Sequence, residues 1–408
     1  MNTAVAQPMA SNYRWVMAAL SLAAHLVLGL NLFGISPVLP LVIEDYQINR
    51  VTAGLLISLP MLVGAALGIP GGMLVASIGV RRANLIAWIA MAILALSFLS
   101  PNFAAMLILR LAYGIGLAMT ITSTGPLLMG WFSQKEVLVM NALNTALVSL
   151  GVAISVSGAA PLAAMTDWKI AMSLFGVLGV AGAVAWAVAG RDAPFSGSRP
   201  APITLRQTLG VLRGRTVVLL VLTDAGVLVQ YTALTSWLPS FFNEHRGMSL
   251  GEAGLVTGVL PFIGVFAVLL GGALPLRFGS ARPIFLISGV AAALGGIGTF
   301  LLPGTTMIYV AAAVLGFGSW FYVPMLLTLP LRMSDISPQN LAVIYGSIMT
   351  FSGIAMFVSP ILVGAFRDIS SSFLLGFLVC WAMSWTALLA GALLPSEVTR
   401  SPTTTAAL

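Results

Sequence analysis

Twelve apolar stretches run along this 408-residue chain, and each has the length of about 20 residues that a helix needs to cross a bilayer. Short polar groups such as Glu44-Asp45, Arg81-Arg82 and Glu244-His-Arg246 separate many of the stretches. The pattern predicts an all-α polytopic membrane protein with twelve transmembrane helices. The predicted spans are residues 15–42, 53–76, 83–100, 104–131, 137–164, 170–190, 216–242, 253–276, 283–302, 306–330, 342–366 and 371–394.

The composition excludes several classes of protein. Only 7% of the residues are charged, against about 25% in an average soluble domain. So few charges cannot cover a water-facing surface, which excludes a soluble enzyme, a disordered chain and a coiled coil. One cysteine, Cys380, and two histidines, His25 and His245, are too few for a disulfide framework, an iron–sulfur cluster or a histidine-rich metal site. We therefore expect a protein that is not an enzyme and holds no cofactor.

The basic residues indicate how the chain is oriented. With the N-terminus inside, thirteen of them fall in inner segments and four, Arg50, Lys169, Arg246 and Arg367, fall in outer loops. Cytoplasmic loops of membrane proteins are rich in Lys and Arg, so both termini are expected in the cytoplasm of a bacterial-type inner membrane. The net charge of +7 thus reports topology, because the scattered arginines form no basic stripe for a nucleic acid.

The two halves of the chain repeat each other. Ala53-Gly54-Leu55 recurs 200 residues later as Ala253-Gly254-Leu255, and Gly71-Gly72 recurs as Gly271-Gly272. Such a series indicates duplication, and two parallel six-helix repeats around a central site are the architecture of an alternating-access transporter. We predict a six-helix bundle over residues 1–190, a cytoplasmic loop over 191–215, a second six-helix bundle over 216–394 and a cytoplasmic tail over 395–408.

Two motifs carry a resemblance to a known family. The second span ends in Gly72-Met-Leu-Val-Ala76-Ser77-Ile-Gly79-Val-Arg81-Arg82, and the fourth contains Arg110-Leu-Ala-Tyr113-Gly114-Ile-Gly116. With these motifs the chain resembles the major facilitator superfamily over essentially its whole length. That family has the pattern G-x-x-x-D-R-x-G-x-R-R after its second helix and R-x-x-x-G-x-G on its fourth.

The resemblance implies the major facilitator fold, a single-chain monomer and a cytoplasmic gate. The gate positions in the two copies of the motif are Gly72, Gly79, Arg81, Arg82, Gly272 and Arg277. Ala76 and Leu276 stand where the family has an acid, so the inner gate is expected to close without the usual charge network. The fifth helix also lacks the Gly-Pro pair typical of drug antiporters, which favours uptake over efflux.

Arg110 lies within the fourth apolar span, where a charge costs about 2.5–3.5 kcal/mol and needs a partner or a wet cavity. Tyr113, Leu117, Thr120 and Thr124 share its helix face, a mostly polar stripe that suits a cavity wall. Without a resident acid, the guanidinium could receive a substrate carboxylate through two parallel hydrogen bonds. In the alternative interpretation, Arg110 is a structural arginine tied to backbone carbonyls.

Asp224 and His25 are the other ionisable residues inside apolar spans, and both are candidates for proton coupling. Asp224 could instead reach the cytoplasmic surface or pair with Arg213 or Arg215. His25 could instead be a packed, neutral imidazole. Arg110 and Asp224 differ in expected depth by roughly 8 Å across a core of ~30 Å, so we expect no direct ion pair between them.

Further substrate-binding candidates follow from helical spacing. Tyr113 lies beside Arg110, and Tyr231 shares a helix face with Asp224. The repeat aligns Ser319 and Tyr322 of the tenth span with the Arg110 stripe, which gives the second half hydroxyl groups in place of an arginine. Asn31 joins His25 at a cavity only if Gly29 or Gly34 breaks the first helix. Two further candidates are Asn144 and Tyr345.

The leading hypothesis is a secondary transporter that imports a small organic anion together with protons, as a monomer in a lipid bilayer. The alternative is a proton-driven exporter of lipophilic or cationic compounds. A sensor or scaffold without transport is a third class. It would normally need a sizeable soluble output domain, and the segments outside the predicted spans are too short for one.

Overall fold

The computed structural model describes residues 12–192, 210, 213–273, 281–333 and 338–394. The predicted central loop, the tail and the gate residue Arg277 lie largely or wholly outside these ranges. The elements are α1 (Arg14–Leu32), η1 (Ser36–Val38), α2 (Leu39–Tyr46), α3 (Arg50–Ala66), α4 (Gly68–Ile78), α5 (Val80–Ala92), η2 (Ile93–Leu99), α6 (Phe103–Trp131), α7 (Gln134–Met165), α8 (Trp168–Ala189), α10 (Arg215–Arg246), α11 (Leu250–Ala273), α12 (Arg282–Leu301), α13 (Thr305–Phe321), α14 (Val323–Thr328), η4 (Pro330–Arg332), α15 (Pro338–Ser370), α16 (Leu374–Ser384) and α17 (Thr386–Leu393).

The described helices confirm the predicted all-α membrane fold. Eleven are long and apolar enough to cross a bilayer, and the number is twelve if α3 and α4, bent by 62°, form one span. Helices suit this environment because each satisfies its backbone polar groups internally, where lipid offers no partners.

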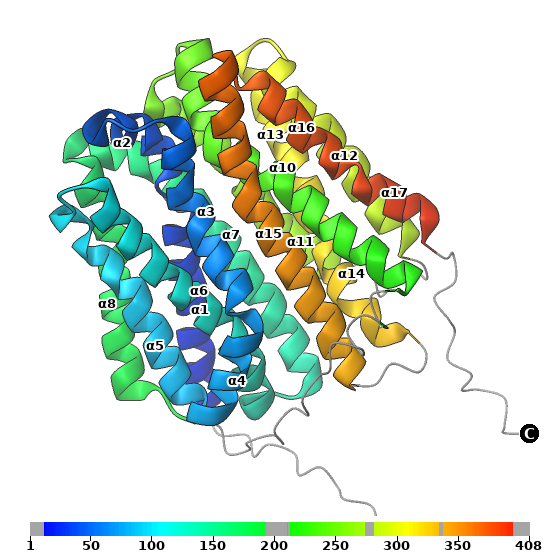
Figure 1. Cartoon of the computed structure of the whole chain (residues 1–408). Coiled ribbons are helices and arrows are strands. Elements are labelled where there is room, and N and C mark those ends of the chain that lie inside the picture. Colours follow the sequence, from blue (N-terminus) through cyan, green and yellow to red (C-terminus); the bar gives the residue numbers. More distant parts are fainter. Residues whose placement is uncertain (1–11, 193–209, 211–212, 274–280, 334–337, 395–408) are drawn as a thin grey trace, which may run out of the picture.

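The helices α1 to α8 form the first half of the molecule, and α10 to α17 form the second half (Figure 1). The halves meet along a seam where α3 packs on α15 and α7 packs on α11. Glycines bring the backbones close there. A methyl group added at Gly54 would lie 3.2 Å from the Pro360 carbonyl oxygen, and one at Gly254 would lie 2.6 Å from that of Val156. Small residues allow such close helix crossings in membranes.

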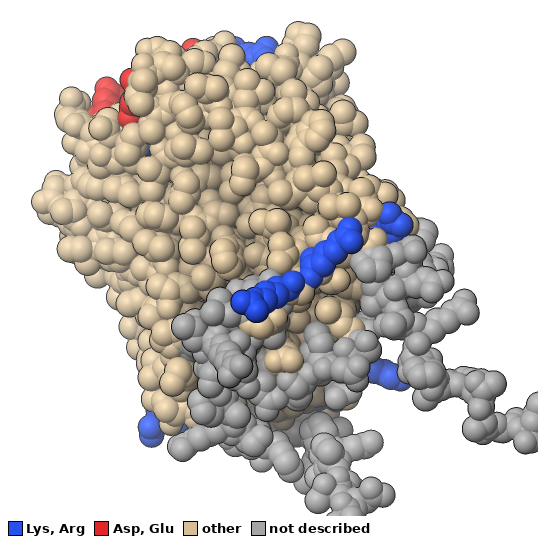
Figure 2. Space-filling model, turned by 45° about the vertical axis from the view of Figure 1, so that its right-hand side comes forward, with Lys and Arg blue, Asp and Glu red and all other residues tan. Residues whose placement is uncertain are grey.

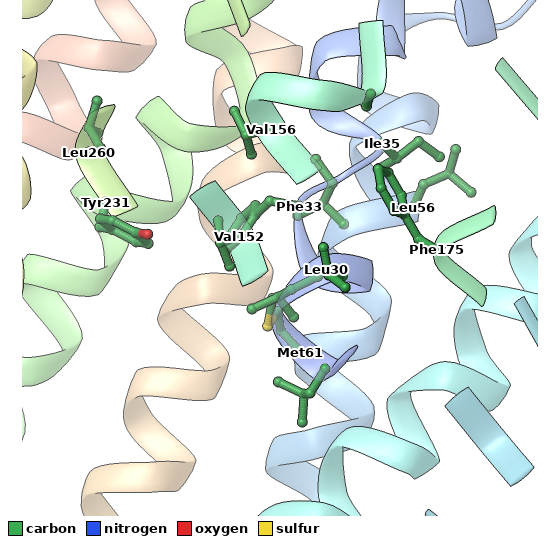
Figure 3. Packing of buried hydrophobic residues seen from close by; sticks show 14 of the residues in the cluster. Leu30, Phe33, Ile35, Leu56, Met61, Val152, Val156, Phe175, Tyr231 and Leu260 are labelled. Atoms are coloured by element: carbon green, nitrogen blue, oxygen red, sulfur yellow. The ribbon is translucent and has the colours of Figure 1, made fainter. Parts of the chain in front are cut away.

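Buried apolar side chains continue across this seam (Figure 3). The cluster joins Leu30 and Phe33 of the first half to Tyr231 and Leu260 of the second. Elsewhere large apolar side chains face outward, as Ile108 does with 64% of its surface exposed. This distribution fits a molecule whose outer solvent is lipid.

On the face drawn in Figure 2, charged side chains lie toward the two ends of the molecule, and a wide band without Lys, Arg, Asp or Glu lies between them. We call the end that carries Arg14, Arg81 and Arg215 the terminus side, because the described chain begins and ends there. Most described acids lie at the other end, the far side. The far-side acids are Glu44, Asp45, Asp167, Glu244, Glu252 and Asp368.

Four charged residues tie the two halves together on the far side, and we call them the seam latch. Glu244 at the end of α10 accepts from Arg50 of α3 at 2.8 Å and from Arg367 of α15 at 2.8 Å. The Asp368 carboxylate accepts from the backbone N–H of Val51 at 3.1 Å, at the start of α3. These groups are about one-quarter exposed or less, so water screens them less than a fully exposed pair.

A proline-dependent contact lies beneath the seam latch. The Ser36 hydroxyl lies 2.5 Å from the Thr235 carbonyl oxygen and 2.6 Å from that of Ser236, across the seam. The Thr235 carbonyl lacks its usual helical donor, because residue 239 is a proline and has no N–H. A sequence irregularity in α10 thus provides an acceptor for the first half.

We predict that Glu244→Gln weakens closure of the far side, because a neutral amide cannot pair with both arginines. A loss of about 1–2 kcal/mol would change the ratio of closed to open molecules about 5- to 30-fold. Distances between spin labels at Gln47 and Thr306, in a Cys380→Ser background, measure that ratio. Glu252→Gln is the matched control, since Glu252 caps α11 within its own half. Equal distance distributions for the two variants would contradict the prediction.

Candidate functional site

Arg110 lies at the point where α1 ends inside the molecule. The chain bends after Leu32, and a methyl group added at Gly34 would lie 2.8 Å from the Leu30 carbonyl oxygen. The last carbonyls of a helix have no donors within it. Arg110 supplies them: its Nη1 donates to the Asn31 carbonyl at 2.6 Å, and its Nη2 donates to that of Leu32 at 3.0 Å. A cation at a helix C-terminus also interacts favourably with the helix dipole.

The third hydrogen bond of Arg110 compensates for a proline. Its Nε donates to the Leu56 carbonyl of α3 at 2.6 Å. Residue 60 would normally donate to that carbonyl, but Pro60 has no N–H. The guanidinium therefore joins the broken end of α1 to the irregular part of α3. This geometry agrees with the alternative interpretation, in which Arg110 is a structural arginine bonded to backbone carbonyls. Its role in binding an anion stays a prediction.

The surroundings of Arg110 leave its guanidinium buried but not fully hydrogen-bonded. Its guanidinium is 5.4 Å from the centre of the Tyr113 ring, and the Tyr113 hydroxyl donates to the Leu28 carbonyl at 2.7 Å. Arg110 is only 2% exposed. A guanidinium has five N–H groups, so the three carbonyl bonds leave two donors for another acceptor.

Asp224 is buried in the second half and is held by hydroxyl groups from two other helices. Tyr322, between α13 and α14, donates to its Oδ1 at 2.8 Å, and Ser352 of α15 donates to its Oδ2. Among the ion pairs of the described residues, none includes Asp224. Arg215 instead donates to the Leu393 carbonyl at 3.2 Å. The geometry therefore differs from the alternative in which the acid pairs with Arg215.

His25 lies on α1, the first helix of the first half, much as Asp224 lies on α10, the first helix of the second half. Its Nδ1 lies 2.8 Å from the Ser21 carbonyl oxygen, and its Nε2 lies 3.3 Å from the Thr124 hydroxyl of α6. The repeat that aligns Thr120 with Tyr322 places His25 three residues from the equivalent of Asp224. Each half therefore joins an ionisable group on its first helix to a hydroxyl group on or just after its fourth.

The remaining substrate-binding candidates are dispersed. Asn31 donates to the Phe175 carbonyl of α8, and Asn144 of α7 pairs with Ser21 of α1, so both bonds stay within the first half. The Ser319 hydroxyl bonds to its own helix, and Tyr345 donates to the Leu327 carbonyl at 2.5 Å. Because α1 runs unbroken to Leu32, the break that could expose Asn31 comes after that residue.

Tyr231 is the candidate that lies on the seam. Its ring meets Phe33 of α1 edge-on, with the ring centres 6.1 Å apart, and meets Trp320 of α13 edge-on at 5.3 Å. Its hydroxyl has no hydrogen-bond partner in the described part of the chain. Trp320 was not expected from the sequence, where it looks like one more apolar residue in a span.

The structure brings an acid from elsewhere in the chain to the gate motif, whose own acid position holds Ala76. Gly79 separates α4 from α5 with a positive φ of 86°, and Asp192, beyond the end of α8, accepts from the backbone N–H of Arg81 at 2.9 Å. The Trp186 indole also donates to the Arg81 carbonyl. Arg82 is exposed, and methyl groups at Gly72 or Gly272 would meet open space. Asp192 was missed because it lies more than 100 residues from the motif.

The comparisons with known proteins agree with this fold. A family model described as Major Facilitator Superfamily matches residues 21–360. A bacterial homologue of the human lysosomal transporter Spinster, solved in an inward-facing and unoccupied conformation, superposes with a TM-score of 0.69. That superposition covers 94% of each chain at 18% sequence identity.

Three curated relatives with transporter names share 21% to 24% sequence identity with this chain. The "Probable sulfoacetate transporter SauU" of Cupriavidus necator is 24% identical and covers 86% of each chain. The "Probable L-galactonate transporter" of Escherichia coli is 23% identical over 76% of this chain and 72% of its own length. The "Hexuronate transporter" of Bacillus subtilis is 21% identical over 57% of each chain.

We predict that Arg110→Ala destabilises the protein and that Pro60→Ala reduces this effect. Removing Arg110 leaves three buried carbonyls unpaired, each costing about 1–3 kcal/mol. An alanine at position 60 restores an N–H donor for Leu56, so the double variant should recover about 1 kcal/mol. Apparent melting temperatures of the four proteins in detergent measure this coupling.

Pro261→Ala is the matched control for this cycle. Pro261 is the interior proline of α11, in the second half of the molecule, whereas Arg110 and Pro60 lie in the first. It should show additive effects with Arg110→Ala. Additive effects for Pro60→Ala as well would show that the Leu56 bond does not depend on the proline.

Proposed function

Because the chain belongs to the Major Facilitator Superfamily and is a multi-pass membrane transporter, we propose that it imports a small organic anion together with protons. The proposed unit is a monomer in a bacterial-type inner membrane, and it works by alternating access around the seam. The observation that carries the proton coupling is Asp224, a buried acid bonded to hydroxyl groups from two other helices.

The bonding of Asp224 explains how a proton would act. As a carboxylate, Asp224 accepts two O–H groups, from Tyr322 and Ser352. A protonated carboxyl must itself donate one hydrogen bond, so at least one hydroxyl has to turn or move away. Since these partners lie next to the α13–α14 break and on α15, proton binding would alter how three helices pack together.

The charge distribution supports an orientation. The described terminus side carries Arg14, Arg81, Arg82, Arg215 and Arg282, whereas acids dominate the far side. Positively charged loops favour the cytoplasm. We place the terminus side in the cytoplasm, so the seam latch closes the outer face in this conformation.

The anion assignment rests on Arg110 and on the relatives. Arg110 is a buried cation without an acid partner among the described ion pairs, and two of its N–H groups are unused. A carboxylate could accept both donors once α1 and α6 separate enough to admit it. Three relatives are named as transporters of galactonate, sulfoacetate and hexuronate, and all three of these compounds are organic acids.

The second candidate is proton-driven efflux of lipophilic cations. It is favoured by Asp224, which would attract a cation, and by the aromatic rings of Tyr231 and Trp320 on the seam side of the same half. The two functions move protons in opposite directions relative to the substrate, so one assay separates them.

We predict that a galactonate, hexuronate or sulfoacetate gradient acidifies the lumen of proteoliposomes that contain a pH dye. Tetraphenylphosphonium should give no proton movement. Asp224→Asn should lower the proton flux at least about tenfold while retaining exchange of the labelled anion, because it cannot release a proton. Asp45→Asn, at an exposed acid that pairs with Lys169, is the control.

Either of two outcomes would overturn the proposal. Proton efflux driven only by the lipophilic cation would assign the second candidate. Full proton coupling in Asp224→Asn would place the proton carrier elsewhere.

A further inference from the structure

Three buried polar atoms on the seam side of the second half have no hydrogen-bond partner among the described residues. They are the Tyr231 hydroxyl, the Thr235 hydroxyl and the Trp320 indole N–H. Tyr231 and Thr235 are one turn apart on α10, and the polar atoms of Thr235 and Trp320 lie beside the Tyr231 hydroxyl. Each of the three atoms still lacks a hydrogen bond within ordinary distance and angle limits.

Thr235, like Thr232 on the same helix, departs from the behaviour of several other buried threonines in this chain. The hydroxyls of Thr120, Thr124 and Thr257 each donate to the carbonyl four residues earlier in their own helix. A helical threonine normally makes this bond when it is buried away from water. Thr235 instead leaves its hydroxyl unpaired beside Tyr231, although a local acceptor is within its own helix.

Burying a polar group without a partner is unfavourable, and most buried polar groups in folded proteins are paired. Three such atoms at one place favour a polar ligand that pairs them. Figure 3 shows the Tyr231 hydroxyl directed toward the first half, where Phe33 and Val152 lie. Phe33 follows Leu32, whose carbonyl binds Arg110, so the cluster and Arg110 flank the same break in α1.

We propose that Tyr231, Thr235 and Trp320 form a hydroxyl-binding subsite and that the transported anion is therefore a polyhydroxylated carboxylate. This inference rests on the proposed function. A carboxylate can only accept hydrogen bonds, whereas the cluster offers one N–H donor and two hydroxyls that both donate and accept. Sugar hydroxyls match that set. The apolar wall of Phe33 and Val152 suits the C–H groups of such a ligand.

The subsite lies between the two charges of the proposed mechanism. Asp224 is seven residues from Tyr231 on the same face of α10, which is roughly 10 Å along a helix. Arg110 lies on the other side of the seam. A six-carbon sugar acid could thus place its carboxylate toward Arg110 and its hydroxyls on the subsite, with the proton carried separately.

The test compares acids that differ only in their hydroxyl groups. Galactonate and hexanoate have six carbons and one carboxylate each, and glucuronate is a second hydroxylated probe. Binding to the full-length protein in nanodiscs is measured by calorimetry. We expect wild type to bind at least one hydroxylated acid about tenfold more tightly than hexanoate. Tyr231→Phe and Thr235→Val should each remove most of that difference and leave hexanoate binding unchanged.

A matched variant separates ligand binding from folding. Ser288→Ala also removes an unpaired buried hydroxyl, but on α12, and it should leave all affinities unchanged. None of the three substitutions should lower the melting temperature of the ligand-free protein, since each removes an unpaired group.

The outcomes distinguish the subsite from the proposed function. If hexanoate binds as tightly as the hydroxylated acids, or if Tyr231→Phe and Thr235→Val leave the difference intact, the subsite is wrong. The proposed function still stands in that case, provided any organic anion moves protons in proteoliposomes. If no organic anion binds or moves protons, both are overturned.

Discussion

The bonds that Arg110 makes to three carbonyls are the interaction on which the first half depends. In lipid a helix cannot simply stop or contain a proline, because water is absent and the freed carbonyls need partners. One guanidinium serves the end of α1 and the proline-freed carbonyl of α3 at once. The bend after Leu32 brings Phe33 and Ser36 to the seam, so the contact surface with the second half follows from this one side chain.

The second half has a different buried ionisable residue on its first helix, Asp224 of α10. Its buried charge is an acid, and its partners are neutral hydroxyls that can either donate or accept. Such a group can change protonation without leaving an opposite charge unpaired in the membrane. Related positions of the two halves thus hold different ionisable groups, His25 in the first half and Asp224 in the second.

The sequence predicted the all-α membrane fold because the length and the apolar composition of each span are local properties of the chain. It also gave Arg110, Asp224, His25 and Tyr231 as candidates, since a polar residue inside an apolar span is visible without any structure. It could not show which partners they have. Thr124, Ser352, Trp320 and Asp192 are ordinary residues until helices distant in the chain pack together. Pro60 and Pro239 were readable signals, because a proline inside a helix frees the carbonyl four residues earlier.

The glycine crossings of the seam have a mechanical consequence. Where Gly54 faces Pro360 and Gly254 faces Val156, backbone meets backbone without a side chain between them. At such a crossing the two helices can shift against each other without a large side chain having to change its rotamer. If the halves rock as proposed, the contacts that must change are the seam latch and the apolar contacts around Phe33 and Tyr231, while the cohesion of each half resides in its interior. Substitutions at the seam would therefore change the transport rate, whereas substitutions inside each half would change the thermal stability.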